Sequence, residues 1–331
     1  MENKRVVMAS RPAGWVTENN FRIETAPVSK PQDGEILVKN LWLSLDPYMR
    51  GRMNDTKSYA ARQEIGEVMI GGAVGEVIES RNAKFAVGDK VVGMLGWQLY
   101  RCSDGVGLNK IDASRAPMSA FLGVLGMPGV TAWVGLLDIC QPKAGETVVV
   151  SAASGAVGSV VGQIAKLKGC RAVGIAGGKA KCDYVVNELG FDACVDYKAG
   201  RLNDDLKAAA PKGIDCYFEN VGGEILDAVL RQMNAFSRIA VCGLISQYNA
   251  TEPYGVKTFQ SILTNRIKVQ GFIVSDRMEL WASALPELIG WVSSGKIKYR
   301  ETVAHGLESA PKAFIGLLKG ENFGKQVVKL T

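Results

Sequence analysis

The stretch "SAASGAVG", residues 151–158, decides the fold of this 331-residue chain. It follows the apolar run "TVVV" and precedes "SVVGQIAKLKGC", whose apolar residues recur at helical spacing. A short turn of small residues between a strand and a helix is typical of a site that binds the pyrophosphate of a dinucleotide. The segment therefore predicts a nucleotide-binding βα unit.

The glycines of this turn have separate tasks. Gly155 lets a phosphate approach the backbone N–H groups, and Gly158 lets the helix pack closely on the strand. The helix is expected to begin near Ala156 and Val157, and its N-terminus supplies partial positive charge. Ala153 stands where such turns commonly have their first glycine. The backbone tolerates an alanine there if its dihedral angles are ordinary.

Strand–helix alternation continues from about residue 145 to residue 274. Expected strands cover 146–152, 171–177, 193–197, 214–221, 237–245 and 268–274, and expected helices cover 157–169, 179–189, 202–210, 223–234 and 257–265. Repeated βα units with strands rich in Val and Ile predict an α/β Rossmann domain, a doubly wound parallel sheet with helices on both faces. Segment 117–139 also has a helical period, which Pro128-Gly129 is expected to interrupt.

The two ends of the chain have a different pattern. The first third is β-rich, with alternating segments such as "EILVKNLWLSL" and glycines at the joints. After helical segments at 277–294 and 309–319, the tail returns to strand patterning at 325–331. We therefore expect residues 1–125 and 300–331 to form one domain, and residues 126–299 to form the nucleotide-binding domain.

The second expected strand of the nucleotide domain indicates which nucleotide is bound. An Asp or Glu at its end would hold an adenine ribose, but the chain reads "GIAGGKAK" at 174–181. The missing carboxylate removes repulsion toward a 2′-phosphate, and Lys179 and Lys181 supply attraction. This pattern favours NADPH over NADH.

Composition narrows the class of protein. The hydrophobic fraction of 47% and the charged fraction of 22% are those of a soluble globular protein. The net charge of +6 comes from scattered Lys and Arg, so we expect no nucleic-acid partner. No apolar run is long enough to span a bilayer, and the N-terminal segment has no signal-peptide core, so we expect no membrane association and a cytoplasmic location.

The cysteine and histidine content argues against a metal site. The seven cysteines form no CxxC pair, and we expect them to be buried, reduced thiols. The single histidine, His305, has neither close cysteine partners for zinc nor a nucleophile to serve, so we expect it to be structural.

The whole chain resembles the medium-chain dehydrogenase/reductases. The similarity is to their zinc-free branch, which contains leukotriene/prostaglandin reductases, plant enone double-bond reductases and bacterial curcumin reductases. The matching motifs run from end to end: "LSLDPYMRGRM" at 43–53, "LGMPGVTAWVGLLDI" at 125–139, "SAASGAVGSVVGQIAKLKGC" at 151–170, "DCYFENVGG" at 215–223, "VCGLISQYN" at 241–249, "QGFIV" at 270–274 and "FIGLLKGENFGKQVVKL" at 314–330.

The resemblance implies a GroES-like β-barrel catalytic domain beside the Rossmann domain, and a homodimer, for which the apolar strand at 268–274 is the candidate pairing edge. It also implies that Lys181 and Tyr197 hold the 2′-phosphate of NADPH. The rest of the cofactor would be lined by Asn220, the segment 242–248 with Cys242, Gly243 and Ser246, then Phe272, Val274 and Asn322. The implied reaction is hydride transfer from NADPH to the β-carbon of an α,β-unsaturated carbonyl compound, a small-molecule enone of the curcumin type.

Such a reaction needs no metal if a hydroxyl group stabilises the developing enolate. Tyr248 follows a strand of the parallel sheet, where strand ends face the ligand, and Tyr48 follows Asp46-Pro47 in the other domain; both are expected to be catalytic. Tyr59 is a weaker candidate for a wall of the substrate pocket. We expect Asp46 and Arg50 to be structural, in an ion pair that braces the loop. A quinone oxidoreductase and a non-enzymatic NADPH-binding protein remain alternatives.

Overall fold

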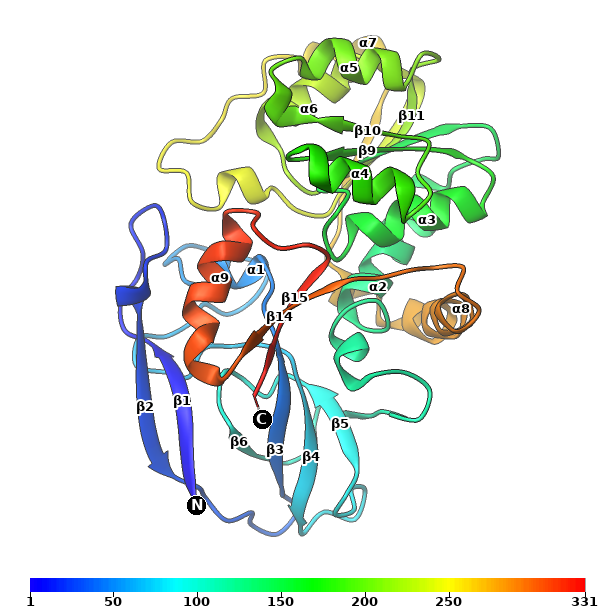
Figure 1. The fold of residues 1–331 in the computed structure, drawn as a ribbon. Helices are drawn as coiled ribbons and strands as arrows, with labels where there is room; N and C mark the ends of the chain where they lie inside the picture. Colours follow the sequence, from blue (N-terminus) through cyan, green and yellow to red (C-terminus); the bar gives the residue numbers. More distant parts are fainter. Residues whose placement is uncertain (331) are drawn as a thin grey trace. The chain divides into compact units, whose positions relative to one another are not determined.

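The computed structural model describes residues 1–330 and divides into two compact units. One unit contains Met1–Gly123 and the residues from Glu301 onward, and the other contains Val124–Arg300. Each unit has its own sheet (Figure 1).

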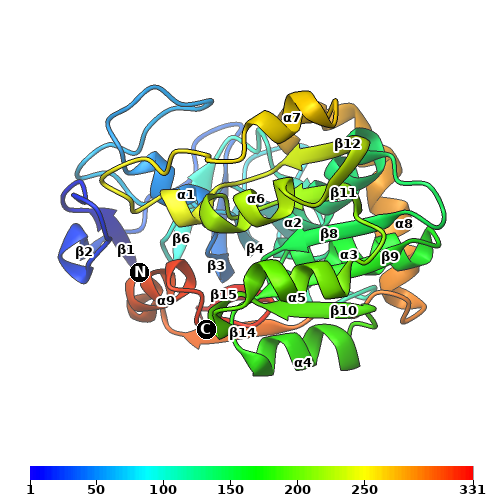
Figure 2. The same ribbon diagram turned by 90° about the horizontal axis from the view of Figure 1, so that it is seen from above.

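The 124–300 unit is built on a six-stranded parallel sheet. Its strands are β8 (Thr147–Ser151), β9 (Arg171–Ala176), β10 (Ala193–Asp196), β11 (Ile214–Glu219), β12 (Met233–Val241) and β13 (Lys268–Gly271). Their spatial order is β10-β9-β8-β11-β12-β13, so β9 and β10 extend the sheet on one side of β8, and β11, β12 and β13 extend it on the other. This is the strand order of a dinucleotide-binding Rossmann fold. Figure 2 shows β10 to β12 side by side in this order. The predicted doubly wound sheet is confirmed.

Helices cover both faces of this sheet. They are α2 (Met127–Trp133), a π-helix (Val134–Cys140), α3 (Gly158–Leu167), α4 (Lys179–Asn187), α5 (Leu202–Ala209), α6 (Gly223–Leu230), α7 (Gln260–Thr264) and α8 (Trp281–Ser293), with short 3₁₀ turns at Tyr197–Ala199, Ile245–Gln247 and Val274–Leu280. Figure 1 shows α5 and α6 on one side of the strands and α2 and α3 on the other. Leu206 of α5 and Val229 of α6 join Val149 and Val173 in one core.

Several element boundaries differ from the sequence prediction, and three of these differences have a physical reason. The interruption expected at Pro128-Gly129 is wrong, because Pro128 lies in the first turn of α2, where a missing N–H costs nothing. The helix expected over 223–234 ends at Leu230, since Met233 is buried and pairs with Ile214 of β11. The helix expected over 277–294 begins as a 3₁₀ segment, with a non-helical Arg277 before α8.

The other unit is built on a seven-stranded sheet and a two-stranded ribbon. The ribbon pairs β1 (Glu2–Met8) with β2 (Phe21–Pro27). The sheet has the order β14 (Glu301–His305), β15 (Lys325–Lys329), β3 (Ile36–Ser44), β4 (Ala73–Ser80), β5 (Lys90–Gly93) and β7 (Asn109–Lys110), with β6 (Tyr100–Ser103) also pairing with β3. Residue 331 of the last expected strand lies outside the described residues.

The helical elements of this unit are short. They are α1 (Tyr48–Arg52), α9 (Ala310–Leu318) and 3₁₀ turns at Glu18–Asn20, Met118–Leu122 and Leu307–Ser309. Aromatic side chains from distant segments meet in the core: Trp97 stacks on Phe21 at 5.6 Å between ring centroids and meets Phe314 of α9 edge-on at 5.7 Å. The C-terminal segment therefore belongs to the same core as the N-terminal one.

None of the helices within residues 1–330 is both long enough and apolar enough to cross a membrane.

Candidate active site

The turn after β8 is shaped by a close approach to the carbonyl oxygen of Ala152. The N–H of Gly155 donates to that oxygen at 2.9 Å. A Cβ atom on Gly158 would lie 2.3 Å from the same oxygen, and this distance is too short for any side chain. Glycine is therefore required at 158, where α3 begins, and the helix N-terminus directs its partial positive charge at the turn.

The alanine in the first-glycine position is accommodated without strain at that residue. The positive φ of the turn falls on Ala152, at 51°, rather than on Ala153. The N–H of Ala153 donates to the carbonyl of Ile175 on β9 at 3.0 Å. A Cβ on Gly174 would lie 2.7 Å from the Ala153 Cβ, so the glycine of β9 makes room for the alanine of the turn.

Two lysines, Lys181 and Lys198, lie near each other after the carboxyl ends of β9 and β10. Lys181, in the first turn of α4, is partly buried, and burial together with the nearby charge of Lys198 lowers its pKa. Two neighbouring ammonium groups repel each other, and an anion bound between them would offset this repulsion and favour the charged form of both lysines. This arrangement fits a 2′-phosphate.

Tyr197 lies against the same corner. A Cβ on Gly177 would lie 2.9 Å from its ring, so the glycine at the end of β9 lets the tyrosine cover the turn. Asp196 accepts hydrogen bonds from the N–H groups of Gly178, at 2.7 Å, and Lys198, at 3.0 Å, which holds the two strand ends together.

The two lysines of "GGKAK" differ. Lys179 is highly exposed and forms an ion pair with Asp183, one turn along α4, at 2.6 Å. Lys181 is the one that lies near Lys198. Lys198 is not among the residues predicted from the sequence, although its position directly after Tyr197 could have indicated it.

A buried carboxylate joins the ends of β8 and β11. Glu219 accepts hydrogen bonds from the hydroxyl of Ser151, at 3.0 Å, and the N–H of Val221, at 2.6 Å. Burial raises the pKa of Glu219. Asn220 donates from its side chain to the carbonyl of Ser151 at 2.8 Å. The amide of this predicted cofactor residue is thus oriented by the strand beside it.

The loop after β12 carries most of the other predicted cofactor residues. The N–H groups of Cys242 and Gly243 donate to the carbonyl of Glu219, at 2.9 and 3.1 Å. The hydroxyl of Ser246 donates to the carbonyl of Val221 at 2.6 Å. Burial raises the pKa of the Cys242 thiol to about 12, so the thiol is neutral.

The hydroxyl of Tyr248 turns back over this loop. It accepts a hydrogen bond from the N–H of Leu244 at 3.2 Å, and a Cβ on Gly243 would lie 2.9 Å from it. The loop after β13 holds Phe272, whose ring meets Phe218 edge-on at 6.1 Å, and the buried Val274. The structure thus places the predicted residues of this unit at the carboxyl ends of neighbouring parallel strands.

The predicted tyrosines of the other unit lie together. Tyr48 begins α1, and its hydroxyl lies 4.0 Å from the Met94 sulfur. Burial, with smaller contributions from Asp46 and Tyr59, raises the pKa of Tyr48 well above its usual value, so its phenol stays protonated. Tyr59 is 57% exposed, and its ring lies 5.4 Å from the guanidinium carbon of Arg52.

The remaining residues of this unit have structural contacts. Asp46 forms a buried ion pair with Lys325 at 3.0 Å, which links the loop after β3 to the C-terminal strand. Arg50 donates to the carbonyl of Gly14 at 2.7 Å and to the side chain of Asn54. The amide of Asn322, predicted to line the cofactor, is buried and donates to the carbonyl of Gly324 at 2.8 Å.

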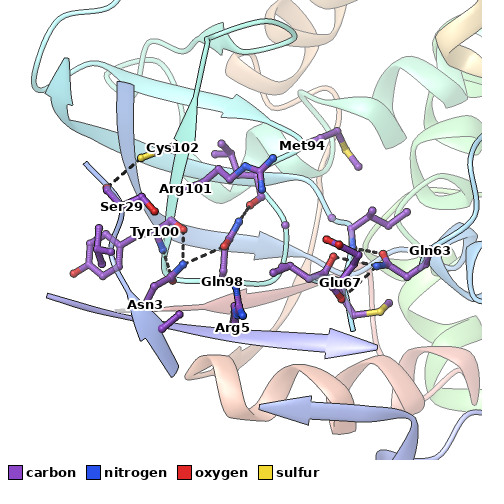
Figure 3. Close-up of a pocket in the computed structure, with 18 of the residues that line it drawn as sticks. Asn3, Arg5, Ser29, Gln63, Glu67, Met94, Gln98, Tyr100, Arg101 and Cys102 are labelled. Carbon is purple, nitrogen blue, oxygen red and sulfur yellow. Dashed lines mark hydrogen bonds between the residues drawn. The ribbon is translucent and has the colours of Figure 1, made fainter. Parts of the chain in front are cut away.

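A cavity of about 530 Å³ in the same unit contains none of the predicted site residues (Figure 3). Its polar side chains have partners: Asn3 donates to Gln98 and to the carbonyl of Tyr100, and Arg5 donates to Glu24 of β2. The Asn3 contacts join β1 to β6 and the segment before it, and the Arg5 contact joins β1 to β2. The cavity is therefore a feature of the scaffold rather than a second candidate site.

Metal ligands do not gather anywhere in the described chain. Among residues 1–330, no three or more His, Cys, Asp and Glu side chains are placed to hold an ion. All seven cysteines are free; four are buried, and Cys102, Cys194 and Cys242 are partly exposed, so the expectation that all seven are buried is wrong for these three.

Two family profiles match the chain. The one described as the N-terminal domain of oxidoreductase matches residues 4–111, and the one described as zinc-binding dehydrogenase matches residues 156–294. The chain belongs to the medium-chain dehydrogenase/reductase family, in its zinc-independent branch, and is an oxidoreductase.

Individual relatives match over the full length. The NADPH-dependent curcumin reductase of Escherichia coli is 51% identical, over 99% of this chain and 97% of the relative. The 2-alkenal reductase (NADP(+)-dependent) of Nicotiana tabacum is 46% identical, over 100% and 98%. The crystal structure of CurA from Vibrio vulnificus in complex with NADPH is 50% identical, covers 99% of both chains and superposes with a TM-score of 0.95.

Proposed function

We propose that this chain is an NADPH-dependent reductase of the carbon–carbon double bond of α,β-unsaturated ketones and aldehydes, with curcumin-type enones among its substrates. The observation that carries the proposal is the pair Lys181 and Lys198 beside Tyr197, where an enzyme specific for NADH would have a carboxylate. The names of the relatives from E. coli and tobacco support the cofactor and the substrate class.

The cofactor is NADPH, and it would be held by residues of the 124–300 unit. The turn at 152–158 and the N-terminus of α3 would bind the pyrophosphate, and the basic corner at Lys181 would bind the 2′-phosphate. Asn220 and the loop 242–248 would line the nicotinamide ribose. When bound, NADPH supplies the hydride that reduces the β-carbon of the enone.

The chain's own part in the chemistry is to stabilise the oxygen of the substrate. As the β-carbon is reduced, negative charge develops on the carbonyl oxygen, and a protonated phenol can donate a hydrogen bond to it. The bond that Tyr248 accepts from Leu244 polarises its O–H group and makes it a better donor. Tyr48 has a raised pKa, so it too can act as a donor and not as a base.

The proposal is tested by following NADPH oxidation with a panel of acceptors. A small enone, a diarylheptanoid dienone and a benzoquinone separate the candidate activities. The proposal expects turnover of the first two with saturated ketones as products. Turnover of the quinone alone would support a quinone oxidoreductase instead.

We also propose a homodimer formed through β13. This strand is at the edge of the sheet, pairs with β12, and exposes Val269. Its outer edge can pair antiparallel with the same strand of a second copy, as an isologous interface requires. Light scattering is expected to give twice the mass of the chain, and the mass of a monomer would overturn this arrangement.

A further inference from the structure

We propose that Cys182 and Cys194 form a redox-active dithiol, which a hydroperoxide converts to a disulfide beside the basic corner of the nucleotide domain. The two sulfur atoms lie 3.0 Å apart. Cys182 belongs to the first turns of α4, and Cys194 belongs to β10, so the bond would join a helix to its neighbouring strand.

The surroundings of the pair keep the two sulfurs together. The backbone N–H of Cys182 donates to the carbonyl of Gly178 at the start of α4. Cys194 lies opposite Gly174 in the pairing of β10 with β9, and a Cβ on Gly174 would lie 3.3 Å from its sulfur. The absent side chain of Gly174 thus provides the space in which Cys194 reaches Cys182.

The two thiols have different chemical roles. The Cys194 thiol donates its hydrogen bond to the sulfur of Cys182. This bond lowers the pKa of Cys182, against the opposing effect of burial, and the N-terminus of the nine-residue helix α4 also favours a thiolate there. Cys182 is therefore the attacking sulfur and Cys194 the resolving one.

The oxidation balances with a hydroperoxide as the two-electron oxidant. The Cys182 thiolate attacks the peroxide oxygen, the O–O bond breaks, and the leaving oxygen takes up a proton, which leaves a sulfenic acid. The Cys194 sulfur then attacks the Cys182 sulfur, the S–O bond breaks, and water leaves with the thiol proton. Two thiols are oxidised and one hydroperoxide is reduced to water and an alcohol or a second water.

The disulfide would act on cofactor binding. Closing the disulfide brings the two sulfurs together, and the proposal places part of this movement in the start of α4. Lys181 directly precedes Cys182, and Tyr197 follows Cys194 by three residues. This consequence rests on the proposed function, because it assumes that these residues bind the 2′-phosphate.

The sequence offers a direct mass measurement of the disulfide. No Lys or Arg lies between the two cysteines, so trypsin releases both on the single peptide 182–198. The whole protein is treated with hydrogen peroxide and then alkylated under denaturing conditions. The dithiol predicts a peptide that has lost two hydrogen atoms and takes up no alkyl group, and dithiothreitol should restore two alkylation sites.

Other cysteines serve as matched controls. Cys102 is partly exposed and lies on the peptide 102–110, while burial raises its pKa, and Cys140 and Cys216 are fully buried. The proposal expects peptide 182–198 to be oxidised before these thiols, and Cys194→Ser to convert Cys182 to a stable sulfenic acid or higher oxide. Oxidation of Cys102 while peptide 182–198 still takes two alkyl groups would overturn it.

Cofactor binding is measured separately, by fluorescence titration with NADPH and NADH. The oxidised protein is expected to bind NADPH roughly tenfold more weakly, the factor expected when one charge-assisted hydrogen bond to phosphate is weakened, with a smaller change for NADH. Cys182→Ser should abolish this response to peroxide, and Cys102→Ser should retain it. A disulfide with unchanged NADPH affinity would overturn the link to the cofactor. The mass measurement needs no cofactor, so failure of the proposed function and failure of the dithiol are distinguishable.

Discussion

The phenol oxygen of Tyr248 accepts a hydrogen bond from the backbone N–H of Leu244, four residues earlier, at 3.2 Å. The bond closes a short loop at the carboxyl end of β12 and holds the hydroxyl over Gly243, where a methyl group would come within 2.9 Å of it. A hydroxyl held in this way is a preorganised donor, which is the property that stabilisation of a developing oxyanion requires.

Tyr248→Phe removes this donor and keeps the ring. We expect kcat for a small enone to fall by roughly 100-fold, as loss of one oxyanion donor does, while the affinity for NADPH changes little. Tyr48→Phe is the comparison variant. A fall in its kcat would show that Tyr48 also contributes to stabilising the oxyanion. Full activity in both single variants would contradict the tyrosine assignment.

Lys181→Ala removes one of the two charges at the basic corner. We expect KM for NADPH to rise by roughly tenfold or more, since a charge-assisted hydrogen bond to phosphate contributes about 1.5–3 kcal/mol, and KM for NADH to stay nearly constant. Lys179→Ala is the matched control, because Lys179 is exposed and paired with Asp183. Equal effects on the two cofactors would rule out a 2′-phosphate at Lys181.

The lowered pKa of Lys181 makes this preference dependent on pH. A lysine whose pKa is lowered loses its proton at a lower pH than an ordinary lysine, so its attraction for phosphate is present at neutral pH and is lost as pH rises. We expect KM for NADPH to increase on the alkaline side before KM for NADH does. In Lys181→Ala the two profiles should run parallel, and parallel profiles in the unaltered protein would refute the assignment.

The buried ion pair of Asp46 and Lys325 is expected to stabilise the unit formed by Met1–Gly123 and the residues from Glu301 onward. Lys325→Met leaves the Asp46 carboxylate buried without its cation, which typically costs about 3–5 kcal/mol in the free energy of unfolding. Lys4→Ala breaks an exposed pair with Glu308 in the same unit and should change stability little. Urea denaturation compares the two, and similar small losses would show that the buried pair is not a brace.

Local sequence patterns predicted most of the strands and helices of the nucleotide-binding domain. Each strand and helix has its own periodicity, and the glycines at 155 and 158 mark the turn, so the order of the βα units and the place of the glycine turn could be predicted. The start of β12 could not, because Met233 is drawn into the sheet by β11, which lies elsewhere in the chain.

Contacts between distant residues escaped the sequence analysis for the same reason. Lys325 forms an ion pair with Asp46, although the two residues lie far apart in the sequence. The sequence around each residue contains no sign of its partner. The proximity of Lys198 to Lys181 and of Cys194 to Cys182 depends on the pairing of β10 with β9. From the sequence the cysteines are expected to be buried, reduced thiols, and only the fold shows that Cys194 lies against Cys182.

The transfer of deuterium from labelled NADPH tests the central claim most directly. Both C4-deuterated forms of NADPH are used with an acyclic enone, and the product is examined by nuclear magnetic resonance. The proposed function predicts that one of the two forms places deuterium on the β-carbon of a saturated ketone. Deuterium on the carbonyl carbon of an allylic alcohol, or no transfer from either form, would contradict it.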